Sequence, residues 1–224
     1  MSYEYNKDFF TDDMQSIIDF GVMHRIDKNI LDLATKLDKN NEPIYDRDQI
    51  CEIIQGGFDK LSEEQINTYS ELDENGKPVY DRDMMSIIRL CYCSNLTQEM
   101  IDEILKTYNN EYIYSPSQMN VLRIAFRNNF SFEQINLLNT LNKKMEPVYD
   151  ASQMMVIVDA ILNGLDEDQI KYLNALNKNF VPIFSANEMK EIAAGFTSGL
   201  SKEQIDKYCI LDENEAPIDR KSVV

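Results

Sequence analysis

The feature that most constrains this chain is the near repetition of one short stretch. EPVYDASQMMVI (146–157) closely matches KPVYDRDMMSII (77–88), and weaker copies are EPIYDRDQICEI (42–53) and VPIFSANEMKEI (181–192). The apolar residue after the turn recurs at steps of 36, 35, 34, 35 and 35, at Met14, Ile50, Met85, Met119, Met154 and Met189. A period near 35 over six copies indicates a repeat architecture, in which neighbouring copies bury a shared core.

The first half of each copy predicts a helix. Its apolar residues have helical spacing, as in Met154, Ile157, Val158, Ile161 and Leu162. Before it stands a residue type that caps helix N-termini with a side-chain oxygen: Asp46, Asp81, Ser115, Asp150 or Ser185. After it stands a residue that readily adopts the left-handed conformation closing a helix: Asn95, Asn129, Gly164 or Gly199.

The second half of each copy predicts another helix with a recurrent start. The expected caps are Asp27, Ser62, Thr97, Ser131, Asp166 and Ser201, and Gln65, Gln134, Gln169 and Gln204 complete capping boxes. The apolar residues before the caps are Ile26, Leu61, Leu96, Phe130, Leu165 and Leu200. Those four residues after the caps are Leu31, Ile66, Ile101, Ile135, Ile170 and Ile205. Such pairs are typical of hydrophobic staples, so the sequence predicts six αα-hairpins.

The stretch PVYD is predicted to connect successive hairpins. Proline stops the preceding helix, Val-Tyr runs extended and Asp caps the next helix. The predicted fold is therefore all-α, an α-solenoid of about six αα-hairpin repeats in a single elongated domain, residues 1–224. The repeats are approximately 10–45, 46–80, 81–114, 115–149, 150–184 and 185–219. The first is expected to carry an extra residue in its first helix, and the third lacks one near Asn109–Tyr112.

The repeat motif has a recognisable form. In order along the chain, the motif has an aromatic residue, then Asp or Ser, then Gln-Met, Ile and Gly, and it ends with Gly-Leu and Gln-Ile. The copies that match it best are Tyr149–Ile170 and Phe184–Ile205. The third copy departs most, with Arg89 and Cys91 in the glycine region. This pattern resembles a degenerate αα repeat of uncharacterised proteins from Gram-positive bacteria, their phages and mobile elements. By analogy, a phage or mobile-element origin implies an acidic inhibitor of host defence.

The charge of the chain restricts its partners. A net charge of −17 and a pI near 4.4 disfavour direct binding of nucleic acid or anionic membranes and favour basic partners. The charge is uneven, with a net −6 over 46–80 and −5 over 185–219 but +2 over 115–149. A purely solubilising acidic surface is the alternative interpretation. Because no secretory signal or long apolar run is visible, a cytoplasmic location is expected, the host cytoplasm for a phage protein.

Catalytic and metal-binding motifs do not emerge. His24 is the only histidine and has no identifiable partner for acid–base work, and Cys91 and Cys93 are interpreted as core residues in a helix. Asp38 and Asp73 begin loops that resemble calcium-binding loops, but Pro stands where such a loop needs Gly, and no Glu closes either loop. These loops are therefore read as turns. No enzyme activity, cofactor or metal is predicted.

Two further residue series recur with the repeat. The aromatic series Tyr45, Tyr80, Tyr114, Tyr149 and Phe184 is read as packing between hairpins, with a stacking surface for a ligand as the alternative. The methionine pairs 84–85 and 154–155 are interpreted as core residues, with a binding surface as the alternative.

The functional hypothesis is a non-enzymatic, acidic protein-binding module. It would inhibit a host nucleic-acid-handling defence complex by occluding a basic groove, with carboxylates pairing with the Lys and Arg that hold phosphates. The candidate partner-binding residues are Glu63, Glu64, Glu71, Asp73 and Glu74. The alternative is a structural adaptor or assembly protein, self-associating in one version, whose acidity serves only solubility.

Overall fold

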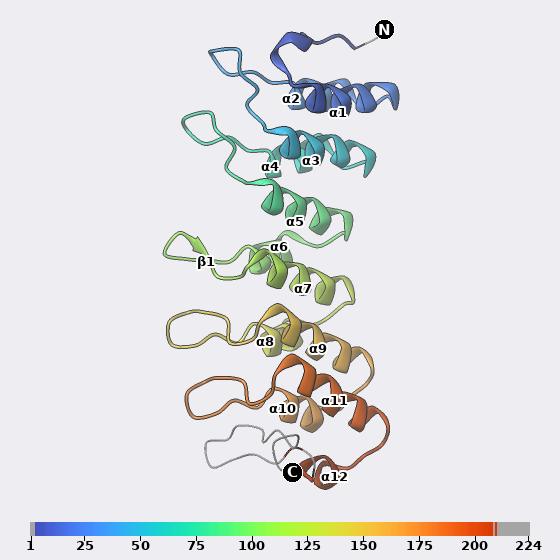
Figure 1. Cartoon of the computed structure of the whole chain (residues 1–224), viewed down its shortest axis with the longest axis vertical. Coiled ribbons are helices and arrows are strands. Elements are labelled where there is room, and N and C mark those ends of the chain that lie inside the picture. Colours follow the sequence, from blue (N-terminus) through green and yellow to red (C-terminus); the bar gives the residue numbers. More distant parts are fainter. Residues whose placement is uncertain (1–2, 208, 210–224) are drawn as a thin grey trace, which may run out of the picture. The chain divides into compact units, whose positions relative to one another are not determined.

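The structure is all-α and built from helical hairpins (Figure 1). This computed structural model describes residues 3–207 and residue 209. Over these residues, the first helices of the hairpins are α1 (Asp12–Met23), α3 (Arg47–Phe58), α5 (Arg82–Cys93), α7 (Pro116–Arg127), α9 (Ala151–Leu162) and α11 (Ala186–Thr197). The second helices are α2 (Lys28–Ala34), α4 (Glu63–Tyr69), α6 (Gln98–Ile104), α8 (Phe132–Leu138), α10 (Glu167–Leu173) and α12 (Lys202–Asp206). Six helical hairpins are thereby confirmed.

The chain forms two compact units, Met1–Ile101 (unit 1) and Asp102–Val224 (unit 2). The sequence predicted one domain and showed no composition break at the boundary. The remainder of the sixth predicted repeat, including Pro217, lies outside the described residues.

The predicted caps explain where the helices begin. Ser62 illustrates the arrangement: its hydroxyl accepts the Gln65 N–H, and the Gln65 side chain accepts the Ser62 N–H at 2.9 Å. The predicted boxes at Gln134, Gln169 and Gln204 are also present. The first helices carry boxes that were not predicted, at Gln49, Gln118, Gln153 and Glu188. The expected left-handed residues have φ of 54° at Asn95, 61° at Asn129, 80° at Gly164 and 84° at Gly199.

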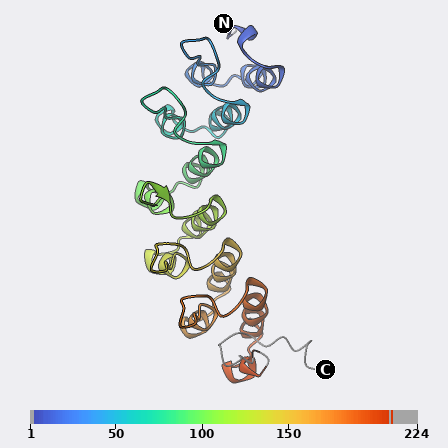
Figure 2. The ribbon, with the colours of Figure 1, turned by 60° about the vertical axis from the view of Figure 1, so that its left-hand side comes forward.

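In unit 1, the first helices form one layer. Helix α3 packs between α1 and α5, and α2 and α4 contact this layer from one side (Figure 2). Ile18, Ile53 and Ile88 occupy equivalent positions in the three first helices and are at most 1% exposed. Near the N-terminus, Phe10 follows a short 3-10 helix, η1 (Lys7–Phe9), and is buried.

Unit 2 repeats this two-layer arrangement. Helix α9 packs between α7 and α11, and α8, α10 and α12 pack against these helices. Leu122, Ile157 and Ile192 continue the buried position that Ile18 occupies in unit 1. On the same helix as Ile157, Leu162 is 51% exposed, so its predicted place on the buried face of that helix is wrong.

The first repeat contains no extra residue, contrary to the prediction from the 36-residue step. Helix α1 has 12 residues, like the other first helices, and its cap Thr11 lies 35 residues before Asp46. The equivalent of the buried Ile50 is therefore Gln15 and not Met14. The Gln15 side chain donates hydrogen bonds to the carbonyls of Lys7 and Phe10, so a polar residue suits this position in the first repeat.

The connectors between hairpins are small β-like loops and not only the extended segments that the sequence suggested. Isolated bridges join Leu37 to Pro43 and Leu72 to Pro78 in unit 1, and Leu141 to Pro147 and Leu176 to Pro182 in unit 2. The third connector is one residue shorter and forms strands β1 (Thr107–Tyr108) and β2 (Glu111–Tyr112). Asn109 and Asn110, both left-handed, make the two-residue turn between them.

The recurrent aromatic residues join successive hairpins. The side-chain amide of Gln49 donates to the Tyr80 carbonyl at 2.8 Å, and Gln118 and Gln153 donate in the same way to Tyr149 and Phe184. Because each of these glutamines also closes a capping box, one side chain ties a helix start to the next connector. Burial confirms the packing interpretation for Tyr45, Tyr114, Tyr149 and Phe184, which are 1–3% exposed, while Tyr80 is half-buried.

The methionine pairs are largely core residues, as predicted. Met84, Met85 and Met154 are buried, with exposed fractions of 6%, 0% and 0%, and Met155 is half-buried.

Candidate functional site

The connectors of unit 1 have a rigid internal hydrogen-bond pattern. An Asp38 side-chain oxygen accepts the N–H groups of Asn40 and Glu42 at 2.8 and 2.9 Å. Asp73 accepts those of Asn75 and Lys77 at 2.9 and 2.8 Å. These hydrogen bonds form Asx turns, so the prediction that these two stretches make turns is confirmed.

These hydrogen bonds lower the pKa of both aspartate carboxyl groups. Hydrogen bonds from the Glu42 N–H and the Asn40 N–H hold the pKa of Asp38 below its ordinary value of 3.8. The pKa of Asp73 is lowered in the same way, first by the Lys77 N–H. In unit 2, Asn142 and Asn177 accept the equivalent backbone N–H groups, so a neutral amide can perform the same structural task.

We expect these two aspartates to contribute to the acid sensitivity of unit 1. A carboxyl with a lowered pKa in the folded state stabilises the fold above its unfolded pKa, and this contribution is lost as the pH falls through the lowered value. The double variant Asp38→Asn and Asp73→Asn should therefore lose less stability than the wild type between about pH 4 and pH 2. Urea midpoints measured across this range test the expectation, with Glu74→Gln as a control for altered charge. If the urea midpoints of the double variant and the wild type fall by the same amount over this pH range, the two aspartates do not cause the acid sensitivity.

The two unit 1 connectors bound a groove of about 810 Å³, which we call the connector groove. It is lined by Asp38, Lys39, Glu42, Pro43, Ile44, Gln49, Asn75, Gly76, Lys77, Pro78, Val79, Tyr80 and Asp81. Its apolar wall includes Val79, whose side chain is 48% exposed. Asn41 and Gly76 hold the left-handed position of the two turns, with φ of 62° and 77°.

Carboxylates extend from one end of the connector groove. Asp81 also lines a neighbouring hollow of about 400 Å³, together with Asp46, Asp48, Arg82 and Asp83. This hollow lies at the N-termini of α3 and α5, where acidic residues interact favourably with the helix dipole. Arg82 contacts Asp83 at 2.9 Å and Glu52 at 3.4 Å, which leaves an excess of acid around the hollow.

The five predicted partner-binding residues are exposed but not gathered in one patch. Glu63 and Glu64 occupy the first turn of α4, and Glu71, Asp73 and Glu74 follow its other end. Glu63 accepts a hydrogen bond from the Asn29 side chain at 3.0 Å, and one Asp73 side-chain oxygen accepts the Lys77 N–H within the turn. Glu71, Asp73 and Glu74 do lie on connector 70–81, which forms one wall of the groove.

The groove itself was not found by sequence reasoning. The repeat pattern identifies Pro43, Ile44 and Val79 only as parts of the segments that connect the hairpins. The sequence does contain a sign of the groove, because these apolar residues recur close to Asp38 and Asp73. They line one groove only because two connectors 35 residues apart in the sequence lie next to each other in the structure.

The remaining sequence candidates occupy ordinary positions. The centre of the exposed His24 ring lies 4.2 Å from that of the Phe20 ring, with the two planes tilted by 44°, and its Nδ1 lies 2.9 Å from the Phe20 carbonyl oxygen. Cys91 is buried as predicted, but Cys93 is exposed, so its assignment to the core is wrong. Partial burial, followed by the neighbouring Asp59, raises the pKa of the Cys93 thiol, which opposes thiolate formation.

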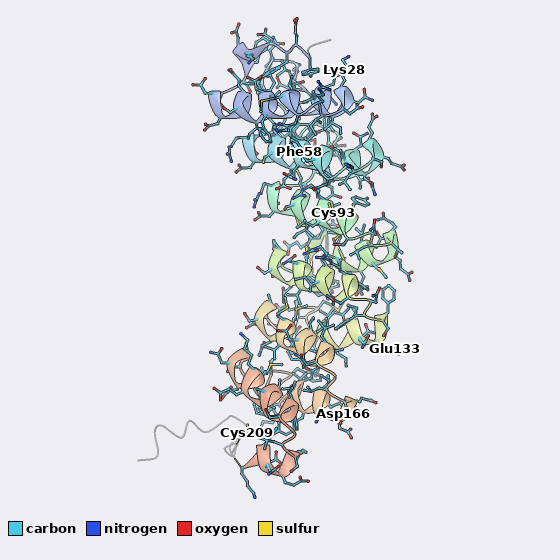
Figure 3. The ribbon with its side chains drawn as sticks, turned by 90° about the vertical axis from the view of Figure 1, so that its right-hand side faces the viewer. Lys28, Phe58, Cys93, Glu133, Asp166 and Cys209 are labelled. Atoms are coloured by element: carbon cyan, nitrogen blue, oxygen red, sulfur yellow. The ribbon has the colours of Figure 1, made fainter. Side chains whose placement is uncertain are left out.

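Unit 2 has a more apolar hollow of about 410 Å³ between its second helices. It is bordered by the start of α8, marked by Glu133 in Figure 3, and by α10, whose cap Asp166 is also labelled there. Leu137, Ile161 and Ile170 provide its apolar wall, and Lys171 pairs with Glu167 at its edge.

Residues 3–207 and 209 offer neither a grouped set of metal ligands nor a membrane-spanning helix. Among these residues, no three His, Cys, Asp or Glu side chains are grouped so that they could hold a metal ion. Across the same part of the chain, no helix combines the length and the apolar character needed to cross a bilayer.

Comparisons of the chain with models of protein families, with curated proteins and with solved structures returned no match.

Proposed function

We propose that this protein is a non-enzymatic protein-binding module whose connector groove receives a basic segment of a partner protein. The observation that carries the proposal is the combination of an apolar wall with acidic residues in one groove. Ile44 and Val79 offer apolar contact, and Glu42 and Asp81 offer carboxylates to Lys or Arg. Lys39 and Lys77 also line the groove, so the acid excess of its lining is small and the wider acid excess of unit 1 adds to the attraction. A groove of this kind fits a short segment that carries both a cation and an apolar side chain.

Long-range electrostatics support the same partner chemistry. Unit 1 has 21 acidic and 10 basic residues, so it holds most of the net charge of −17. Such a field attracts basic partners and accelerates encounter, and it weakens as salt is added. The acids of connector 70–81 and of the hollow beside Asp81 would contribute to this attraction.

In the narrower form of the proposal, the partner is a nucleic-acid-binding protein of a host defence system. Its phosphate-binding Lys and Arg would pair with carboxylates of unit 1, and nucleic acid would then be displaced by occlusion. The groove supports a basic partner in general, and the acid excess of unit 1 is the feature that favours this particular class.

A charge reversal in the groove tests the proposal. Glu42→Lys should raise the Kd for a synthetic peptide of alternating Lys and Phe about 10-fold, because it replaces an attraction by a repulsion. Glu146→Lys is the matched control, since it makes the same change at the equivalent connector position in unit 2; it should change Kd less than about 2-fold. The Kd is measured by fluorescence anisotropy at low and high salt.

The same variants then apply to the biological partner. Tagged wild-type protein captures interacting proteins from the native host, and retained species are eluted by increasing salt. We expect Glu42→Lys to lose the basic proteins that wild type and Glu146→Lys retain. Equal capture by all three proteins, or retention that is indifferent to salt, would overturn the proposal.

A further inference from the structure

An exposed aromatic side chain stands at the tip of a connector in unit 2. Phe180 is 49% exposed, and the next residue, Val181, is 52% exposed. Phe180 has a φ of 61°, in the left-handed region where bulky residues are strained. The equivalent positions in unit 1 are Asn41 and Gly76, residue types that adopt this conformation readily, and the preceding connector of unit 2 has Met145 there, with a φ of 65°.

The turn does not require a phenylalanine there. Asn177 already holds the turn through the N–H groups of Asn179 and Val181, as Asp38 does in unit 1. The side chain of Phe180 is half exposed, so it is not a core residue of unit 2. An exposed apolar side chain that neither the turn nor the core requires is available for contact with another molecule.

One lysine contacts this aromatic residue, and two more stand close to the pair in the sequence. The Lys143 ammonium lies 5.9 Å from the centre of the Phe180 ring, a cation–π contact that joins two successive connectors. Connector 174–185 carries Lys178 and no acidic residue, and Lys144 follows Lys143 in the neighbouring connector. In a chain with a net charge of −17, this basic and apolar group is exceptional. We call Lys143, Lys178, Phe180 and Val181 the connector tip.

The connector tip and the connector groove are complementary. The tip presents an apolar ring and an aliphatic side chain flanked by two lysines. The groove presents Ile44 and Val79 beside Glu42 and Asp81, in a volume of about 810 Å³, and Lys39 and Lys77 complete its charged lining. The chain therefore carries, on separate units, both the basic apolar segment that the groove is proposed to bind and the groove itself.

We propose that the connector tip of one molecule docks into the connector groove of a second copy of this chain. The contact is heterologous, because different surfaces of the two copies meet, and it leaves one tip and one groove free at the ends of every assembly that does not close into a ring. An interface of this small size gives weak association that grows with concentration. The inference rests on the proposed function of the groove and identifies one of its ligands.

Two variants with one disabled surface each test this contact. The tip variant combines Lys143→Glu, Lys178→Glu and Phe180→Asn, and asparagine suits the left-handed position. The groove variant combines Glu42→Lys and Val79→Lys, both at exposed positions. Circular dichroism first establishes that each variant is folded.

The readout is the molar mass from sedimentation equilibrium. The wild type should exceed the mass of a dimer as concentration rises, and each variant alone should stay monomeric. An equimolar mixture should form a 1:1 dimer that grows no further, because only one intact tip and one intact groove can meet. A wild type that remains monomeric, a tip variant that associates as the wild type does, or a mixture that stays monomeric would each overturn the inference.

Peptide binding separates this inference from the proposed function. The tip variant should bind the Lys–Phe peptide as the wild type does, and the groove variant should bind it about 10-fold more weakly. If peptide binding follows this pattern while the mixture stays monomeric, self-docking is overturned and the groove still binds basic segments. If the groove variant binds the peptide as tightly as the wild type, both proposals fall. A tip that binds other acidic proteins but not a second copy of this chain also overturns self-docking.

Discussion

Replacing Gly56 by alanine should destabilise unit 1 by about 2–3 kcal/mol, although alanine favours helices. A methyl group on Gly56 would overlap the hydroxyl oxygen of Tyr69 and also press on Ile66. Tyr69 cannot move aside easily, because it is fully buried and its hydroxyl donates to the Glu52 carbonyl at 3.2 Å. The measurement is the urea midpoint, combined with hydrogen exchange of α3 and α4.

The repeats themselves provide the control. At the position equivalent to Gly56, Ala125 and Ala160 are buried, and the residues equivalent to Tyr69 are Leu138 and Leu173. In a Tyr69→Leu background, Gly56→Ala should therefore become neutral or stabilise by about 0.5–1 kcal/mol. Gly195→Ala should be mild as well, since a methyl group there would lie 3.3 Å from Ile205. A loss of similar size in both backgrounds would show that the tyrosine hydroxyl is not the cause.

Replacing Arg89 by methionine should cost unit 1 about 3 kcal/mol. The Arg89 guanidinium on α5 donates to a Glu52 oxygen on α3 at 2.8 Å and also pairs with Asp59. The Glu52 side chain is only 7% exposed, so the variant would leave a carboxylate largely buried, with only the more distant Arg82 nearby. Removing one partner of a buried ion pair is costly because the other charge stays desolvated.

Two comparisons isolate this effect in urea unfolding. Arg47→Met removes an arginine whose pair with Asp48 is exposed, and it should change the stability by less than about 1 kcal/mol. The double variant Glu52→Met and Arg89→Met should recover most of the loss, because an apolar pair leaves no buried charge. If Arg89→Met alone and the double variant lose the same free energy of unfolding, the unpaired buried carboxylate of Glu52 is not the cause of the loss.

Arg89 also explains why the third repeat departs from the motif. The sequence places Arg89 and Cys91 in the glycine region without indicating a purpose, and only the position of Cys91 has small residues in all the other repeats. In the structure, Cys91 fills the small buried position, and Arg89 reaches α3 of the preceding hairpin. The deviation reflects an ion pair within unit 1 and not a broken repeat.

The hairpins could be predicted because their signals are local. Caps such as Ser62 and Gln65 lie three residues apart, and a staple such as Leu61 and Ile66 spans one helical turn. The prediction failed where a local pattern had two registers. Met14 was aligned with Ile50 because both are apolar, whereas the cap Thr11 places Gln15 at that position.

The candidate site could be predicted only in part. The acidic character of unit 1 was visible in composition, and three of the five proposed carboxylates lie on a connector that borders the groove. Ile44, Val79 and the strained Phe180 were missed, because exposure and φ do not follow from residue type. Phe180 would have been placed in a core by hydrophobicity alone, yet its ring is half exposed.

The amino-acid sequence alone was sufficient to establish six helical hairpins and most of their caps, since those features depend on hydrogen bonds and apolar contacts within a few residues. Tertiary structure decided which surfaces remain open. In unit 1, small or polar residues at Asn41 and Gly76 accompany a groove between connectors, whereas in unit 2 Lys143 and Phe180 bring two connectors into contact. Those outcomes depend on side chains about 35 residues apart, whose distance in space is set only when hairpins stack.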